Sequence, residues 1–187
     1  MFPAASHTLR LRTPILAALA AALMLAVPST TASAQAGQRH CANATANPTS
    51  VSIRQAQRAT LCLLNKKRRA HGLRKLHENG RLDLASVRHA QDMVRRDYFE
   101  HGNFIGRIRS TSYLSGARSW TVGENIAWGS GELATPVAIV KAWMHSPGHR
   151  RNILDGQFRE IGIGIARGTP SGGDDGATYA TDFGARG

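Results

Sequence analysis

Residues 143–154, WMHSPGHRRNIL, contain the end of a helix, a sharp break and a run of polar side chains. Upstream, Thr135 and Pro136 are typical of an N-cap and of the first helical position. Apolar residues then follow at helical spacing, and the tripeptide SPG ends the periodic stretch. The pattern predicts a helix that ends at this break, with polar residues after it that line a surface site. The inward-facing residues of the helix are Val140, Trp143 and Met144.

After this segment the periodicity changes from that of a helix to that of a strand. Isoleucine occupies positions 161, 163 and 165, with small residues between them. The two-residue repeat predicts a strand, and a partner strand is expected over residues 177–183. Because Gly162 and Gly164 leave their face of the sheet without side chains, we expect a helix to approach closely there.

Two further helices are predicted before the strands. The first covers residues 53–70, where Ser52 and Gln55 have the spacing of a capping box. The second covers residues 81–97, and we interpret His89 as a packed, neutral histidine on its inward face. That face consists of Leu82, Ala85, His89 and Met93. Three helices followed by an antiparallel pair of strands place the chain in the α+β class.

The N-terminus has the order of charged and apolar residues found in a secretion signal. Two arginines precede an apolar run over residues 15–27, and small residues, ASA, occupy positions 32–34. We expect residues 1–34 to be a signal peptide that is cut before Gln35. The apolar run is shorter than the roughly 20 residues that span a bilayer, so a retained anchor is the weaker alternative. The protein is therefore expected to be secreted, periplasmic or held at the cell envelope, with no other transmembrane segment.

Cys41 and Cys62 are the two cysteines of the chain. An exported protein reaches an oxidising compartment, where paired thiols form disulfides, so we predict one bond between them. A free reactive thiol or a bridge to another chain is the alternative. Residues 35–51 are small and polar, so only this bond is expected to order that tail. The folded domain is expected to cover residues 52–187, a length suited to a single core.

The chain is strongly basic. Loss of the two arginines in the signal leaves 22 of the 24 lysines and arginines against 12 aspartates and glutamates, a formal net charge of +10. Such a charge favours contact with anionic surfaces. We interpret the densest basic run, residues 66–69, as the solvated side of the first helix, and the few aromatic residues do not alternate with it. Nucleic acid is therefore not expected as a partner.

Four segments combine polar groups with aromatic residues and glycine, as loops that line a cavity do. They are YFEH at 98–101, GENIA at 123–127, the segment 143–154 quoted above and EIGIG at 160–164. In this order, and with LCLLN at 61–65 and DFG at 182–184, they resemble the CAP superfamily, which includes cysteine-rich secretory proteins, antigen 5 and pathogenesis-related 1 proteins. The resemblance is to the bacterial branch and covers residues 55–185.

The resemblance implies a three-layer α-β-α sandwich with a central antiparallel sheet. It also implies a surface cleft in which two histidines and two acidic residues hold a divalent metal, often zinc. The matching positions are His101, Glu124 and His149. The fourth position departs from the pattern, because Ser146 stands where animal and plant relatives carry a glutamate.

Three roles are open to Glu124: metal ligand, general base on a bound water, or acceptor of a hydrogen bond that fixes the tautomer of a histidine. Asn125, Ser146 and Asn152 are expected to line the same cleft, and the two asparagines to bond backbone groups. Core packing is the expected role of the tryptophans at positions 128 and 143.

We predict a secreted, monomeric binding module, because the family that the chain resembles shares extracellular interaction rather than one reaction. A lipid, a sterol or an anionic cell-envelope surface is the expected partner. The alternative is a zinc-dependent hydrolase in which His101 and His149 hold the metal and Glu124 is the general base. The chain has no HExxH helix to support it. A serine nucleophile at Ser146 would lack the G-x-S-x-G turn.

Overall fold

The computed structural model describes residues 40–187, so the predicted signal peptide at 1–34 and its cleavage before Gln35 lie outside the described residues. The strands form one sheet in the order β1-β3-β4-β2. β2, β4 and β3 pair antiparallel, whereas the two-residue β1 runs parallel to β3. β2 is therefore an edge strand. The strands are β1 (His77–Glu78), β2 (Trp120–Ser130), β3 (Glu160–Arg167) and β4 (Gly176–Arg186).

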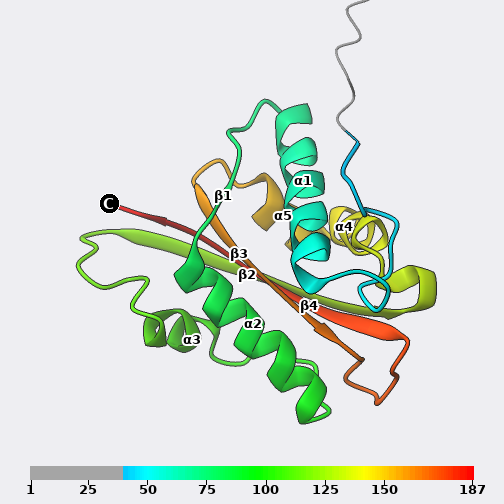
Figure 1. The fold of residues 1–187 in the computed structure, drawn as a ribbon. Helices are drawn as coiled ribbons and strands as arrows, with labels where there is room; N and C mark the ends of the chain where they lie inside the picture. The colour runs from blue at the N-terminus through cyan, green and yellow to red at the C-terminus, as the bar shows by residue number, and fades with distance from the viewer. Residues whose placement is uncertain (1–39) are drawn as a thin grey trace, which may run out of the picture. The chain divides into compact units, whose positions relative to one another are not determined.

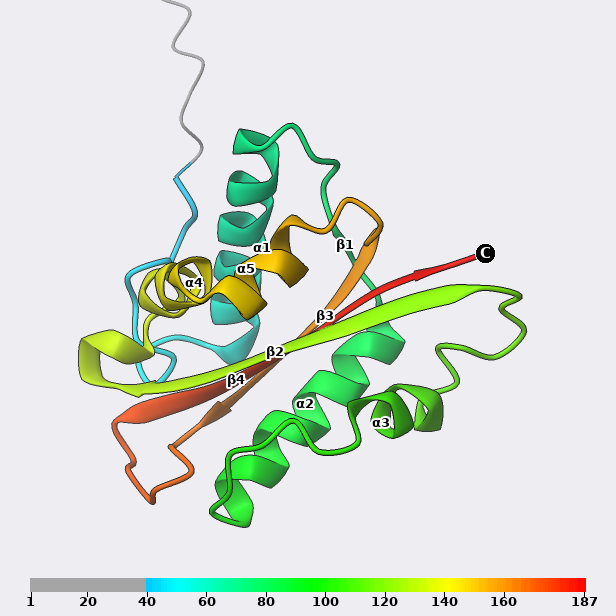
Figure 2. The ribbon, with the colours of Figure 1, turned by 180° about the vertical axis from the view of Figure 1, so that it is seen from behind.

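Helices cover both faces of this sheet (Figure 1), and Figure 2 shows the same layers from behind. On one face lie α1 (Ile53–Ala70), α4 (Pro136–His145) and α5 (Pro147–Leu154). On the other lie α2 (Gly80–Arg95) and α3 (Phe104–Ser110), and a 3-10 helix, η1 (Gly131–Ala134), follows β2. The prediction of an α+β, three-layer α-β-α sandwich is confirmed, with β1 as the one parallel strand. No helix in residues 40–187 has the length and apolar character needed to cross a membrane.

β3 presents a different surface to each layer. Its three isoleucines are buried in the core that includes residues of α1, α4 and α5. On the opposite face, a Cβ atom on Gly162 would collide with the backbone of Leu82, and one on Gly164 with the backbone of Ser86. The missing side chains let α2 lie directly on the sheet, as the alternating glycines predict.

The first two helices agree with the sequence analysis. α1 has the predicted bounds, and Ser52 and Gln55 make both hydrogen bonds of the capping box. α2 buries the four predicted residues, including His89. It ends at Arg95 rather than at residue 97. The φ of Asp97 is 50°, which lies outside the range of a right-handed helix, so the helix cannot include this residue.

In the basic run at 66–69, Lys66, Lys67 and Arg69 are exposed, as expected, and only Arg68 departs from the expectation. Arg68 is fully buried, and burial lowers the pKa of its guanidinium. The guanidinium donates hydrogen bonds of 2.8–3.2 Å to the carbonyls of Arg74, Ile153, Asp155 and Phe158. Burial is possible because the fork of N–H donors meets several backbone carbonyls at once. One side chain thus joins the end of α1 to the end of α5 and to the loop before β3.

Two segments have a different secondary structure from the one expected. Residues 123–127, expected as a cavity-lining loop, lie in the middle of β2, which pairs with β4 along its whole length. Glycine, glutamate and asparagine form strands poorly, so pairing with β4 outweighs their propensity. The SPG sequence ends α4 as predicted, but Pro147 also starts α5, because proline suits the first helical position. α3 and β1 were not predicted.

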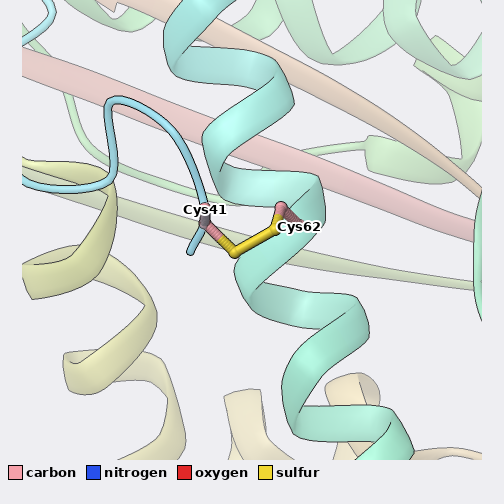
Figure 3. The surroundings of a disulfide bond; sticks show 2 residues. All are labelled: Cys41 and Cys62. Atoms are coloured by element: carbon pink, nitrogen blue, oxygen red, sulfur yellow. A yellow bond between two sulfur atoms is a disulfide. The ribbon is translucent and has the colours of Figure 1, made fainter. Parts of the chain in front are cut away.

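The disulfide between Cys41 and Cys62 is confirmed (Figure 3). The two Cα atoms are 5.6 Å apart, and residues 40–187 contain no free cysteine. The bond joins the segment before α1 to the middle of that helix, so the alternatives of a free thiol and an intermolecular bridge are set aside.

Hydrogen bonds also hold the segment 40–51, so the expectation that the disulfide alone orders it is wrong. The side-chain amide of Asn47 donates to the carbonyls of Gly131 and Asp175 at 2.8 and 3.1 Å. The guanidinium of Arg167 donates to two further carbonyls of the segment at 3.0 and 3.1 Å. The segment is therefore attached to η1, to the end of β3 and to the loop before β4.

Candidate functional site

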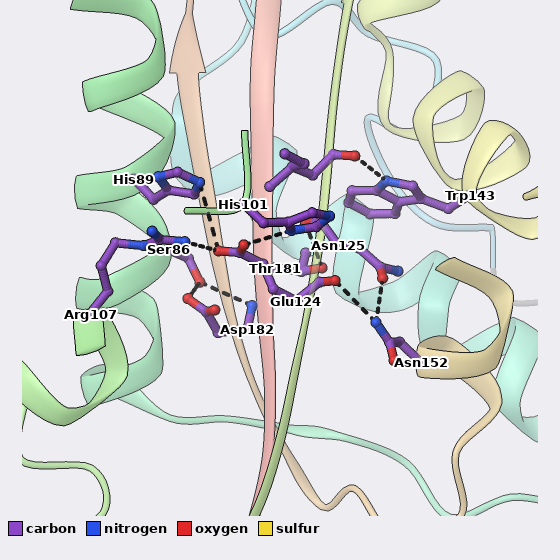
Figure 4. Close-up of polar contacts among 11 residues, drawn as sticks. Ser86, His89, His101, Arg107, Glu124, Asn125, Trp143, Asn152, Thr181 and Asp182 are labelled. Atoms are coloured by element: carbon purple, nitrogen blue, oxygen red, sulfur yellow. Dashed lines mark hydrogen bonds and ion pairs between the residues drawn. The ribbon is translucent and has the colours of Figure 1, made fainter. Parts of the chain in front are cut away.

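Glu124 is the centre of a group of polar side chains on the edge strand β2 (Figure 4). Its side chain is 1% exposed. Its Oε1 accepts a hydrogen bond from Nδ1 of His101 at 2.8 Å, and its Oε2 accepts one from Nη2 of Arg107 at 2.5 Å. Both carboxylate oxygens are therefore engaged. We refer to Glu124, His101, Arg107 and His149 as the edge-strand site.

The connection between α2 and α3 brings two of these residues to the carboxylate. Gly102, directly after His101, has a φ of 52°, which glycine adopts without strain, and it turns the chain. Asn103 caps α3, because its side chain accepts the N–H of Gly106 at 2.8 Å. α3 then carries Arg107 to Glu124.

Of the three roles considered for Glu124, the geometry supports the orienting one. A carboxylate only accepts hydrogen bonds, so Nδ1 of His101 carries a proton, and in the neutral ring Nε2 is the acceptor. The side chain of His101 is 50% exposed, so its ring is open to a ligand. Arg107 compensates the charge of the buried carboxylate, which would otherwise be costly.

The next residue of β2, Asn125, makes hydrogen bonds to α5, in the helix layer on the other face of the sheet. Its Nδ2 donates to the carbonyl of His149 at 3.1 Å. Nδ2 of Asn152 donates to Oδ1 of Asn125 at 2.9 Å and to the carbonyl of Glu124 at 3.0 Å. These bonds agree with the expectation that the two amides bond backbone groups, and they fix α5 against β2.

His149 lies in α5, and its ring is half buried. The ring centroid is 6.5 Å from that of Trp143. Burial first, and then the electrostatic effect of the nearby His101, lower the pKa of His149. Ser146 stands at the junction of α4 and α5 and makes no capping hydrogen bond.

A second group of polar residues is buried beside Glu124. Asp182 in β4 is opposite Glu124 in the strand register, and burial, together with the charge of Glu124, raises its pKa to about 7. The hydroxyl of Ser86 donates to Oδ2 of Asp182 at 2.7 Å. His89 is 1% exposed, and its Nε2 lies 3.8 Å from Oε2 of Glu124. Burial lowers the pKa of His89, and neither ring nitrogen has a hydrogen-bond partner among the described residues.

The sequence analysis anticipated part of this arrangement. The resemblance had placed His101, Glu124 and His149 in one cleft, and the structure brings His101 and Glu124 into a direct hydrogen bond. The buried position of His89 agrees with its interpretation as a packed histidine, but the residue also forms a wall of the site. Arg107 and Asp182 were missed. A signal existed only for Asp182, an acidic residue inside the strand predicted over residues 177–183, because Arg107 lies on a short helix without an apolar period.

The residues as arranged do not fit the zinc shell of His101, Glu124 and His149. Within residues 40–187, no three histidine, cysteine, aspartate or glutamate side chains are grouped so as to hold a metal ion. Both oxygens of Glu124 already accept hydrogen bonds, and the positive charge of Arg107 beside them disfavours a further cation. The geometry thus gives no support to the zinc shell, and zinc binding stays a prediction.

Together, an α-β-α sandwich and an edge strand whose glutamate orients a histidine define a CAP-type domain. Residues 61–181 match the family model described as the cysteine-rich secretory protein family, CAP, and the chain belongs to this family. It is 37% identical over 121 residues to the Bacillus subtilis protein YkwD, which covers 64% of this chain and 45% of YkwD. It is 28% identical over 113 residues to the membrane protein YlbC of the same species, covering 60% and 32% of the two chains. The chain thus spans less than half the length of these relatives.

Solved structures show the same fold. An outer surface protein of Borrelia burgdorferi superposes with a TM-score of 0.61 at 18% identity, over 73% of this chain and 97% of that one. An extracellular protein of Bacillus anthracis that contains an SCP domain superposes with a TM-score of 0.55 at 24% identity, over 71% of this chain and 43% of that one. At these identities the likeness concerns the fold alone.

Proposed function

We propose that this domain is an extracellular binding module that holds a small amphipathic ligand, a lipid or a sterol, at the edge-strand site. The observation that carries the proposal is that both carboxylate oxygens of Glu124 accept hydrogen bonds from neighbouring side chains. Its charge is compensated by Arg107, and its hydrogen bond orients His101, whose half-exposed ring remains for a ligand. Such a site offers a fixed hydrogen-bonding group for a polar head rather than a free carboxylate.

Exposed aromatic rings on the same elements favour a ligand that also has an apolar part. Phe99, two residues before His101, is 41% exposed, and Trp128, four residues after Glu124 in β2, is 43% exposed. Core packing was the wrong expectation for Trp128, whereas it is confirmed for Trp143, which is 1% exposed and donates to a backbone carbonyl. Large exposed apolar groups beside a polar site are typical of binding surfaces.

The hydrolase alternative is less well supported by the same geometry. A general base must reach a water that attacks the substrate. Glu124 is almost fully buried, and its two oxygens are already hydrogen bonded to His101 and Arg107. We therefore retain the binding module as the function that the site supports best.

Binding to defined lipid surfaces tests the proposal. The protein would be sedimented with vesicles of phosphatidylcholine alone, with 30% phosphatidylglycerol, or with 30% cholesterol. We expect saturable binding to at least one composition and a loss of tenfold or more in His101→Ala and Trp128→Ser. Leu84→Ser is the matched control, because Leu84 is 41% exposed on α2 and should have no effect. Absence of binding to all three vesicles, or equal binding by wild type and His101→Ala, would overturn the proposal.

A further inference from the structure

An open cavity of about 430 Å³ lies at the end of the sheet where β2 begins and β4 ends. Its volume is in the range of small-ligand sites. Trp120 is four residues before Glu124, which corresponds to about 13 Å along a strand. The lining of the cavity contains none of the four residues of the edge-strand site, so the two sites are treated as distinct. Its lining includes Ser119, Trp120, Thr121, Gln157, Arg159 and Arg186.

Arg159 supplies a fixed positive charge to this cavity. Its Nη1 donates to the carbonyls of Gly156, Gln157 and Phe158, the loop that immediately precedes it. In residues 40–187 all hydrogen bonds of its guanidinium come from this one nitrogen, so Nε and Nη2 keep their N–H groups for another acceptor. A guanidinium held in this way can bind a carboxylate or a phosphate with little loss of side-chain freedom.

A second guanidinium is held beside it. Nη1 of Arg186 donates to the carbonyl of Tyr113 at 3.0 Å, and the guanidinium lies 4.7 Å from the centroid of the Tyr113 ring. One carboxylate faces it, because Oε2 of Glu160 is 3.6 Å from Nε of Arg186. That oxygen also accepts from the hydroxyl of Tyr113 at 2.7 Å. Arg159 and Arg186 thus bring two guanidinium groups to the cavity, against the one carboxylate side chain of Glu160.

The lining of the cavity also contains an aromatic ring, that of Trp120. Trp120 is 40% exposed, and the guanidinium of Arg109 lies 5.8 Å from the centroid of its ring. An exposed indole offers a flat apolar face on which the C–H side of a sugar ring can pack, while the hydroxyls of the sugar reach polar neighbours. Ser119, Thr121 and Gln157, which line the same cavity, supply such polar groups.

We propose that this cavity binds an anionic saccharide, with its carboxylate or phosphate held by Arg159 and Arg186 and its ring packed on Trp120. The proposal goes beyond the lipid or sterol site and uses none of its residues. A uronic acid and a sugar phosphate carry the same recognised chemistry, an anion attached to a pyranose, and they are separate arms of the test.

The test is an NMR titration of the ¹⁵N-labelled full chain, in which three tryptophans give three indole signals. The probes are glucuronic acid, glucose 6-phosphate, glucose and inorganic phosphate. We expect the Trp120 indole and the amides of Ser119 and Gln157 to shift saturably with one or both anionic sugars, with the Trp128 indole unchanged. Glucose and inorganic phosphate should each bind at least tenfold more weakly, and binding should weaken as NaCl is raised from 50 to 500 mM.

Variants locate the site and control for folding. Arg159→Ala should raise the Kd for the anionic sugar at least tenfold, and Trp120→Leu should do so without removing a charge. Arg159→Lys, which keeps the charge but not the fork, should lie between wild type and Arg159→Ala. Arg88→Ala is the matched control, because Arg88 is exposed on α2, and it should bind as wild type does. Equal binding of glucose, equal binding of inorganic phosphate, no shift at Trp120, or wild-type affinity in both Arg159→Ala and Trp120→Leu would overturn the proposal.

Discussion

At the scale of single residues, Arg107 is the cation that compensates the buried negative charge of Glu124. Arg107→Met would leave a carboxylate that is 1% exposed without its cation, and we expect the free energy of unfolding to fall by about 2–4 kcal/mol. Urea unfolding measures the change. Adding Glu124→Gln should recover part of the loss, because the uncompensated charge is then gone. Arg88→Met, an exposed change on α2, should cost less than about 0.5 kcal/mol. Equal losses in Arg107→Met and Arg88→Met would contradict this account.

The stability of the folded protein should depend on pH through the ionisation of Asp182. The pKa of this carboxyl is about 7 in the folded protein and 3.8 ordinarily, so the folded state holds a proton that the unfolded state releases between these values. Its stabilising contribution is complete below about pH 4 and is lost as the pH rises through 7. Wild type should therefore lose stability relative to Asp182→Asn between pH 5 and pH 8, as measured by Tm at several pH values.

Protonation of two histidines should change the stability in the opposite direction, and the comparison with Asp182→Asn corrects for this effect. The folded-state pKa values of His89 and His149 are lowered, chiefly by burial, so their contribution is lost as the pH falls below about 6.5. Wild type and Asp182→Asn share this effect, and the difference between the two Tm curves isolates Asp182. Parallel curves from pH 5 to pH 8 would show that Asp182 does not titrate in this range.

Zinc should bind weakly, because the structure leaves two imidazoles and no free carboxylate at the edge-strand site. We expect a small rise in Tm with zinc at pH 7.5 and none in His149→Ala, since the imidazole of His149 would supply one of the two nitrogen ligands. Ser146→Glu adds a carboxylate where α4 ends, so it should lower Tm slightly in chelator and increase the rise with zinc. An equal rise in wild type and Ser146→Glu would mean that Ser146 does not face a metal position.

At the scale of the elements, the close packing of α2 on β3 depends on Gly164. A methyl group there would meet the backbone of Ser86, which cannot move without displacing the helix. Gly164→Ala should therefore lower the free energy of unfolding by about 1–3 kcal/mol. Gly148→Ala, in α5, is the matched control, because its Cβ would meet no atom closer than 3.9 Å. It should be neutral or stabilise by about 0.5–1 kcal/mol, since alanine is the better helix former. Urea unfolding separates the two outcomes.

The elements also show what local sequence can and cannot predict. The capping box of α1, the apolar face of α2 and the alternating glycines of β3 are local patterns, and each predicted its element correctly. β2 could not be found in this way, because residues 123–127 become a strand through pairing with β4 more than 50 residues later. The edge-strand site shares this limit. His101 and Glu124 were found through the family resemblance, whereas the role of Arg107 depends on a loop and a short helix without an apolar period.

At the scale of the whole molecule, β2 carries both proposed binding regions. Glu124, in its middle, orients the edge-strand site, and Trp120, at its start, lines the basic cavity. An edge strand has neighbours on one side only, so side chains from loops and from both helix layers can gather along its free edge. The two sites should therefore respond to different ligands independently, with additive effects of variants in each.

A disulfide and several hydrogen bonds attach the segment 40–51 to the rest of the domain. The disulfide closes a loop with a sequence separation of 21, so Cys41→Ser with Cys62→Ser should lower the free energy of unfolding by about 3 kcal/mol in the loop-entropy model. Asn47 and Arg167 still bond the segment to the domain, so its amides should stay partly protected from hydrogen exchange. Adding Asn47→Ala to the disulfide-free protein should cost a further ~1 kcal/mol and remove that protection. If the amides of residues 40–51 exchange freely once the disulfide is gone, these hydrogen bonds do not hold the segment by themselves.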